Sequence, residues 1–129
     1  MKNIFKFIIP FLFIVAFTGC MRTLPIHNVE NQAVTYNLPL NEVEKAILKG
    51  GLEKGWEMTV TEPGKIEANI IVRKHTAKIV ISYSEKAYSI IYKDSTNLLY
   101  GSGKIHKSYN KWITYLDQRI QINLLEASS

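Results

Sequence analysis

The chain has 129 residues, with 16 Lys or Arg against 11 Asp or Glu, and a formal net charge of +5 at pH 7. Two of the basic residues, Lys2 and Lys6, belong to an apolar N-terminal segment, and the other 14 are spread along the sequence rather than clustered. This distribution argues against a nucleic-acid-binding protein. Because the sequence contains no CxxC, no HExxH and no Gly-rich phosphate loop, we expect neither a metal site nor a cofactor.

Residues 1–19 are predicted to be a cleaved signal peptide. Lys2 and Lys6 form a cationic start, and residues 7–17 form an apolar run that falls short of the ~20 residues a spanning helix needs. The sequence "FTGC" at 17–20 resembles the lipobox of bacterial lipoproteins, in which a small residue and Gly or Ala precede an obligatory Cys. The resemblance implies cleavage before Cys20 and attachment of a diacylglyceryl group to its thiol. An uncleaved N-terminal membrane anchor is the alternative.

Cys20 is the only cysteine, so its lipidation would leave no thiol for a disulfide. The lipid would make the membrane a partner of the mature protein, because each buried methylene contributes about 0.8 kcal/mol and several acyl chains anchor stably. Met21 stands where Asp would signal retention in the inner membrane in enteric-type sorting. The same resemblance therefore implies the outer membrane, with the protein facing the periplasm.

The 110 residues that follow the signal peptide are enough for one domain. Residues 20–38 are predicted to be the lipidated Cys and a polar tether that ends in a short edge strand at 33–36, and residues 39–127 to be the domain. A first helix is predicted to start with Asn41 as its N-cap and to stop at Gly55. Its apolar face consists of Val43, Ala46, Ile47 and Gly50. Gly50 and Gly51 are unfavourable in a helix, and we expect them to allow close packing on a sheet.

Four segments with alternating apolar and polar residues follow, at 56–61, 65–73, 77–83 and 88–93. Their short connections, which include the turn Pro63-Gly64, predict an antiparallel meander with one face exposed to solvent. Residues 94–107 are predicted to be a polar loop, and Ser108 to cap a final helix. One side of that helix carries Trp112, Ile113, Leu116, Ile120, Asn123 and Leu124. The predicted fold is an α+β two-layer sandwich, with the four-stranded meander and both helices on the same sheet face.

The chain also resembles a family of small proteobacterial lipoproteins over residues 25–122. The resemblance rests on "GW" at 55–56, "RKHTAKIVISYS" at 73–84, "YSIIYKDSTNLLY" at 88–100 and "IHKSYNKWITYLDQRIQ" at 105–121. The family pattern centres on Trp56, His75, Tyr83, Tyr92, Ser95, Asn97, Leu98, Tyr100, Ile105, His106, Tyr109, Asn110 and Trp112. It implies a fold and a location, and no reaction or ligand.

The segment 83–112 is rich in polar and aromatic residues and holds the candidate site. We name as its loop cluster Tyr83, Tyr92, Asp94, Ser95, Asn97, Tyr100, His106, Tyr109 and Asn110. In one interpretation these groups tie the loop together: Asp94 or Asn97 accepts loop amides, and His106 sets the entry to the final helix. In another, Tyr83, Tyr88, Tyr92, Tyr100 and Tyr109 offer stacking area and hydroxyls to a sugar or a protein partner.

Two chemical alternatives remain at this stage. Asp94, Ser95 and His106 are the residue types of a hydrolytic triad, although adjacent Asp94 and Ser95 would have to reach opposite sides of His106. His75, His106 and Asp94 are too widely spaced in sequence to indicate a metal site. We expect a non-catalytic lipoprotein that binds an envelope protein or a cell-wall component. A cell-wall or lipid hydrolase that uses Ser95 and His106, or an inhibitor of a lytic enzyme, is the alternative.

Overall fold

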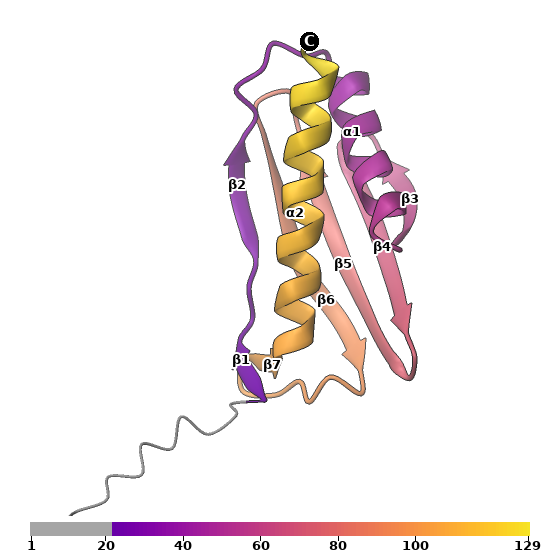
Figure 1. The fold of residues 1–129 in the computed structure, drawn as a ribbon, viewed down its shortest axis with the longest axis vertical. Helices are drawn as coiled ribbons and strands as arrows, with labels where there is room; N and C mark the ends of the chain where they lie inside the picture. Colours follow the sequence, from indigo (N-terminus) through magenta and orange to yellow (C-terminus); the bar gives the residue numbers. More distant parts are fainter. Residues whose placement is uncertain (1–21) are drawn as a thin grey trace, which may run out of the picture.

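The computed structural model describes residues 22–129, so the predicted signal peptide and Cys20 lie outside the described residues. The elements, in chain order, are β1 (Thr23–Pro25), β2 (Val29–Ala33), α1 (Leu40–Glu53), β3 (Glu57–Glu62), β4 (Lys65–Val72), β5 (His75–Tyr83), β6 (Ala87–Thr96), β7 (Lys104–His106) and α2 (Lys107–Ala127). The strands form a five-stranded antiparallel sheet in the order β2-β6-β5-β4-β3 and a two-stranded antiparallel sheet of β1 and β7 (Figure 1). The predicted α+β class is confirmed, but the main sheet has five strands rather than four.

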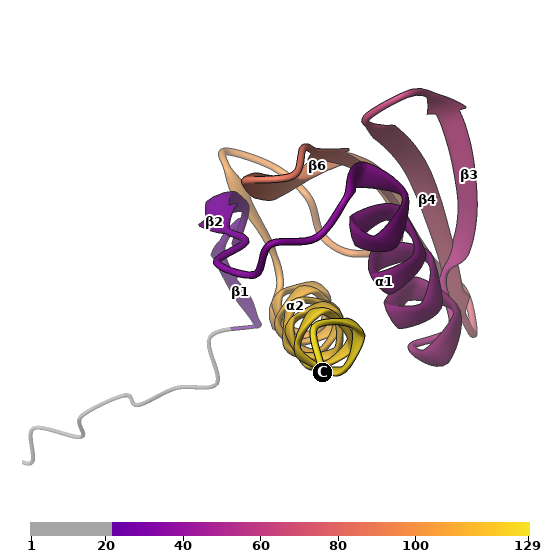
Figure 2. The ribbon, with the colours of Figure 1, turned by 90° about the horizontal axis from the view of Figure 1, so that it is seen from above.

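Both helices lie on one face of the main sheet, and the other face is left open (Figure 2). The alternation of residues along the strands explains this arrangement. In β4, Ile66, Ala68 and Ile70 are buried under the helices, whereas the next residue, Ile71, is 74% exposed. The same inward row continues on β5 with Ala77, Ile79 and Ile81. Within residues 22–129, no helix has the length and hydropathy that crossing a membrane would require.

The segment before α1 belongs to the fold and does not behave as the tether that the sequence predicted. β1 pairs with β7, and β2 forms the edge of the main sheet beside β6. Val29, Val34 and Leu38 are buried, at 7%, 8% and 8% exposure. The edge strand therefore lies at Val29–Ala33 and not at 33–36. An edge strand pairs on one side only, so many of its residues can be polar and face solvent. The alternation of apolar and polar residues that predicts a strand is therefore not visible in this segment.

The N-cap of helix α1 is Pro39, two residues before the predicted N-cap at Asn41, and Gly55 follows the end of the helix with a φ of +83°. The predicted apolar face is buried. A β-carbon on Gly51 would overlap the side chain of Met58 in β3, which agrees with close packing on the sheet. Gly50 packs elsewhere: its β-carbon would lie 3.0 Å from Ile120 Cγ1 and 3.3 Å from the Ile120 nitrogen of α2. Gly50 therefore sets the distance between the two helices.

We predict that Gly50→Val destabilises the protein by about 1–3 kcal/mol, because the added methyl groups would force α1 away from α2. Leu52→Val is the matched control, since Leu52 lies in the same helix and is 67% exposed. We expect the control to change the free energy of unfolding by less than about 0.5 kcal/mol. Chemical denaturation measures both values, and equal losses for the two variants would contradict the proposed helix contact.

Candidate functional site

Eight of the nine loop-cluster residues lie between the second half of β6 and the first turn of α2, and Tyr83 does not. Tyr83 ends β5 and pairs with Tyr88 at the start of β6, at the other end of the strand from His75. Its hydroxyl donates a hydrogen bond to Glu44 Oε2 of α1 at 2.6 Å. Burial and this carboxylate raise the pKa of Tyr83 to about 12. Tyr83 therefore joins the sheet to α1 and is not part of the loop cluster.

A β-bulge brings Tyr92 and Ser95 to the same side of the sheet. The register shifts between Lys78 and Ile79, so that Tyr92 pairs with Ile79 and Ser95 pairs with Ala77. In a regular strand, residues three apart point to opposite faces, and the extra residue of a bulge reverses this relation. As a result, the Tyr92 hydroxyl lies 2.7 Å from Ser95 Oγ, within hydrogen-bond distance.

The ring of Tyr92 is the centre of an aromatic group. Tyr100 stacks on it with ring centroids 4.8 Å apart, and Tyr109 meets it edge-on at 5.6 Å. Tyr109 is fully buried, whereas Tyr100 is 56% exposed. Burial raises the pKa of both Tyr92 and Tyr109. Of the five tyrosines proposed as a binding surface, Tyr100 alone has more than a third of its surface in contact with solvent.

Tyr88, the fifth of these tyrosines, is 1% exposed and donates a hydrogen bond to Asp117 of α2. Burial and the Asp117 carboxylate raise its pKa far above the usual range. Tyr88 therefore joins β6 to α2, as Tyr83 joins β5 to α1. The two tyrosines are contacts between the layers of the fold.

The geometry of Ser95 and His106 differs from that of a nucleophile and its base. His106 Nδ1 accepts a hydrogen bond from the Ser108 nitrogen at 3.1 Å, so His106 is the N-cap of α2. This confirms that His106 sets the entry to the helix, and the prediction that Ser108 is the cap was wrong. Asp94 Oδ1 accepts from the Ser95 nitrogen at 2.8 Å. Among the hydrogen bonds of residues 22–129, none joins Ser95 to His106.

The remaining polar residues connect separate segments. His75 Nδ1 donates to the Asn97 carbonyl at 2.7 Å, and Asn97 Nδ2 donates to the Lys74 carbonyl at 2.8 Å. Asn97 is therefore a donor and not the acceptor of loop amides that the sequence suggested. The ring of His75 is parallel to that of His106, with centroids 6.5 Å apart. In the described part of the chain, no three His, Cys, Asp or Glu residues are placed to hold a metal ion.

Asn110 fixes the N-terminal segment to α2. Its Oδ1 accepts from the His27 nitrogen at 3.0 Å, and its Nδ2 donates to the Pro25 carbonyl at 2.9 Å. The Lys107 nitrogen also donates to the Arg22 carbonyl at 2.9 Å. The start of the described chain is thus held against the first turn of α2. The sequence contained no signal for this contact, because its partners are about 80 residues apart.

The loop between β6 and β7 carries left-handed backbone at residues other than glycine. The φ angles are +56° at Asn97, +56° at Leu99 and +51° at Ser102. Such a conformation costs roughly 1–2 kcal/mol per residue and is unusual for Leu. Leu98 is 1% exposed and anchors the loop in the core, whereas Leu99 is 58% exposed. The strained backbone therefore directs a large apolar side chain into solvent.

The sequence did not identify a set of exposed basic residues that surrounds this loop. They are Arg22, Arg73, Lys74, Lys104 and Lys107. Arg73, Lys74, His75, Asn97 and Leu99 line a shallow hollow between the β4–β5 turn and the loop. No local pattern could have revealed the set, because three separate segments contribute to it.

Comparison of the chain with known protein families, with curated proteins and with solved structures found no match.

Two tyrosine variants distinguish the contacts described above. We predict that Tyr88→Phe lowers the free energy of unfolding by about 1–2 kcal/mol, because Asp117 Oδ1 loses its donor. Tyr109→Phe should cause no loss, because the buried Tyr109 hydroxyl has no partner among the described residues. Urea denaturation of both variants checks this order of stability, and the reverse order would contradict it.

The adjacent leucines form a second matched pair. We predict that Leu98→Ala costs about 2–5 kcal/mol, because it leaves a cavity in the core. Leu99→Ala should stay within about 0.5 kcal/mol of the wild type, because its side chain is mostly in solvent. A large loss for Leu99→Ala in thermal or chemical unfolding would show that Leu99 is needed for folding.

Proposed function

We propose that the protein is a lipid-anchored lipoprotein of the bacterial envelope and that its folded part is a non-catalytic binding module. In this proposal residues 1–19 are a cleaved signal peptide, Cys20 carries the lipid, and the module faces the periplasm from the outer membrane. The sequence "FTGC" after a cationic start and an apolar run is the observation that carries the proposal. The partner would be an envelope protein or a cell-wall component.

The contacts of the loop cluster support the non-catalytic part. Ser95 is engaged by Tyr92, and His106 caps α2 with Nδ1. Both side chains therefore already have roles that maintain the loop and the helix start. A hydrolase would need the Ser95 hydroxyl within hydrogen-bond reach of its base. The accessible features of this region are Tyr100, Leu99 and the basic residues around them, which suit binding better than bond cleavage.

The position of the N-terminal segment supports the anchoring part. β1 pairs with β7, and Asn110 holds the backbone on both sides of Ile26. A lipid two residues before Arg22 would therefore be joined to a fixed point of the fold. The module would be attached by one end, with only a short connection to the membrane.

Cys20→Ala tests the anchor. We expect wild-type chain extracted from bacterial membranes to begin at Cys20 and to carry a lipid on the thiol, whereas Cys20→Ala should retain residues 1–19 and carry no lipid. Intact-mass analysis distinguishes the two forms. Thr18→Ala is the matched control, because a small residue before Gly19 preserves the lipobox and should leave lipidation unchanged. Wild-type chain with an unmodified Cys20 would contradict the proposal.

A further inference from the structure

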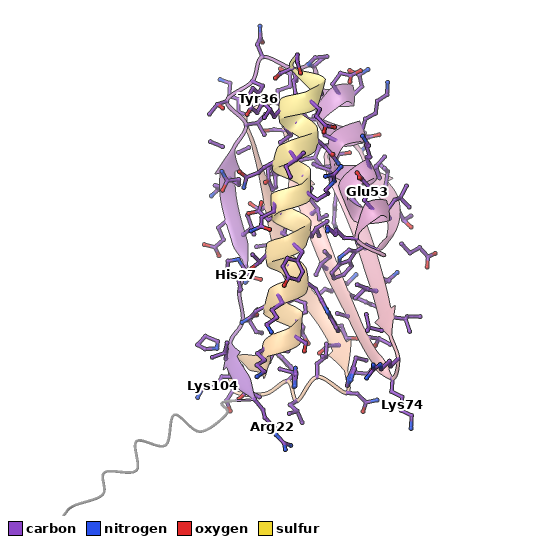
Figure 3. All side chains as sticks on the ribbon, viewed as in Figure 1. Arg22, His27, Tyr36, Glu53, Lys74 and Lys104 are labelled. Carbon is purple, nitrogen blue, oxygen red and sulfur yellow. The ribbon has the colours of Figure 1, made fainter. Side chains whose placement is uncertain are left out.

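Five exposed basic residues gather at one end of the molecule. Arg22 precedes β1, Arg73 and Lys74 form the β4–β5 turn, and Lys104 and Lys107 lie in β7 and at the start of α2. Figure 3 shows Arg22, Lys74 and Lys104 at the same end of the fold. Segments 22–27, 71–76 and 95–107, which form this end, contain these five basic residues and no Asp or Glu. We call this surface the basal face.

The charge of the basal face is not balanced by the surrounding residues. The rest of residues 22–129 holds nine basic and eleven acidic residues, so the excess positive charge of the folded part lies at this end. Within residues 22–129, none of the five basal cations forms an ion pair, whereas Lys45, Lys49, Lys65, Lys93 and Arg119 all do. The nearest acid in sequence, Asp94, pairs in register with Lys78 and accepts the Ser95 amide. The basal cations are therefore free to meet an external anion.

Large apolar side chains are exposed among these cations. Ile71 is 74% exposed, Leu99 58%, Tyr100 56% and Leu24 37%. Leu99 occupies a left-handed backbone conformation that points it away from the core. A mixture of Lys or Arg with exposed aromatic and aliphatic side chains is typical of surfaces that lie in the headgroup region of a membrane.

The end of the described chain indicates which surface this face meets. Arg22 is joined to α2 through the Lys107 nitrogen, and Cys20 precedes Arg22 by two residues. Two extended residues reach at most ~7 Å. A lipid on Cys20 would therefore hold Arg22 close to the bilayer, and contact of the other basal cations with the membrane would add a second anchoring signal to the acyl chains.

We propose that the basal face binds the phospholipid surface, with its cations on anionic headgroups of the phosphatidylglycerol type and Leu99 and Tyr100 in the interfacial layer. This proposal rests on the proposed anchoring at Cys20. It orients the module: the long axis stands away from the membrane, and the start of α1, the β5–β6 turn and the C-terminus face the periplasm (Figure 1). The open sheet face and the far end then remain accessible to a partner.

The test uses the full lipidated chain in vesicles that contain a nitroxide-labelled phospholipid, a short-range quencher. A fluorophore is attached to Ser102→Cys in the basal loop or, as a matched control, to Ser129→Cys at the C-terminus; both serines are exposed. In vesicles of phosphatidylethanolamine and phosphatidylglycerol, we expect the Ser102 probe to lose most of its fluorescence and the Ser129 probe to keep it. Equal fluorescence of the two probes would overturn the proposal.

Charge reversal then tests the headgroup contact. Lys74→Glu with Lys104→Glu should restore most of the Ser102 fluorescence, as should molar salt, because the screening length falls from about 8 Å to about 3 Å. Lys45→Glu with Lys86→Glu, which changes two exposed lysines outside the basal face, should leave the quenching unchanged. Quenching that is insensitive to Lys74→Glu with Lys104→Glu, or that is equally strong in phosphatidylcholine alone, would overturn the binding of anionic headgroups.

The same samples distinguish a failure of the basal contact from a failure of the proposed anchoring at Cys20. A lipidated Cys20 has no free thiol, so each variant chain should take up one fluorophore and the wild type should take up none. Labelling of the wild type, or loss of the wild type from the vesicles, would refute the anchoring. Retention of an unlabelled wild type together with an unquenched Ser102 probe would refute the basal contact alone.

Discussion

The close contact between α1 and α2 is the constraint on which the rest of the fold depends. Five strands at a spacing of ~4.8 Å form a sheet about 19 Å wide. Two helices, at roughly 8–10 Å each, cover that width only if they lie side by side without a gap. Gly50 permits this approach, because a β-carbon there would lie 3.0 Å from Ile120. The helices thereby cover one face of the sheet except at its β3 edge, where Val60 is 42% exposed, and the other face is left to solvent.

Helix α2 makes contacts at both ends of the molecule. Its 21 residues extend about 31 Å at 1.5 Å per residue. In its second half Asn123 donates to the Ala46 carbonyl and to Glu53 of α1, while its first turn holds the N-terminal segment through Asn110. The helix that completes the core therefore also holds Arg22, the first described residue, which follows Cys20 by two positions. An anchor there would be joined to a rigid end of the fold.

The predictions from sequence succeeded where neighbouring residues determine the structure. The helix periodicity around Val43 and Ile47 and the alternation of β4 and β5 depend on which side chains face the core, and these residues are buried as expected. The first alternating strand is an exception, because Val60 is 42% exposed at the edge of the sheet. The predictions failed for β1 and β2, whose partners lie far away in sequence and whose residues are mostly polar. The contact of Tyr92 with Ser95 was equally hidden, because it depends on a bulge in the pairing with β5.

By itself, the sequence determined the α+β class, the faces that the two helices and the strands β4 to β6 bury, and the single cysteine behind an apolar run. These properties follow from hydrophobic periodicity and local composition. Only the tertiary structure decided that the basic residues are not evenly distributed. Arg22, Lys74 and Lys104 are remote in sequence, and the pairing of β1 with β7 and the turn after β4 bring them to one end. Charges that appear scattered along a chain can form one surface, because long-range strand pairing sets their distances.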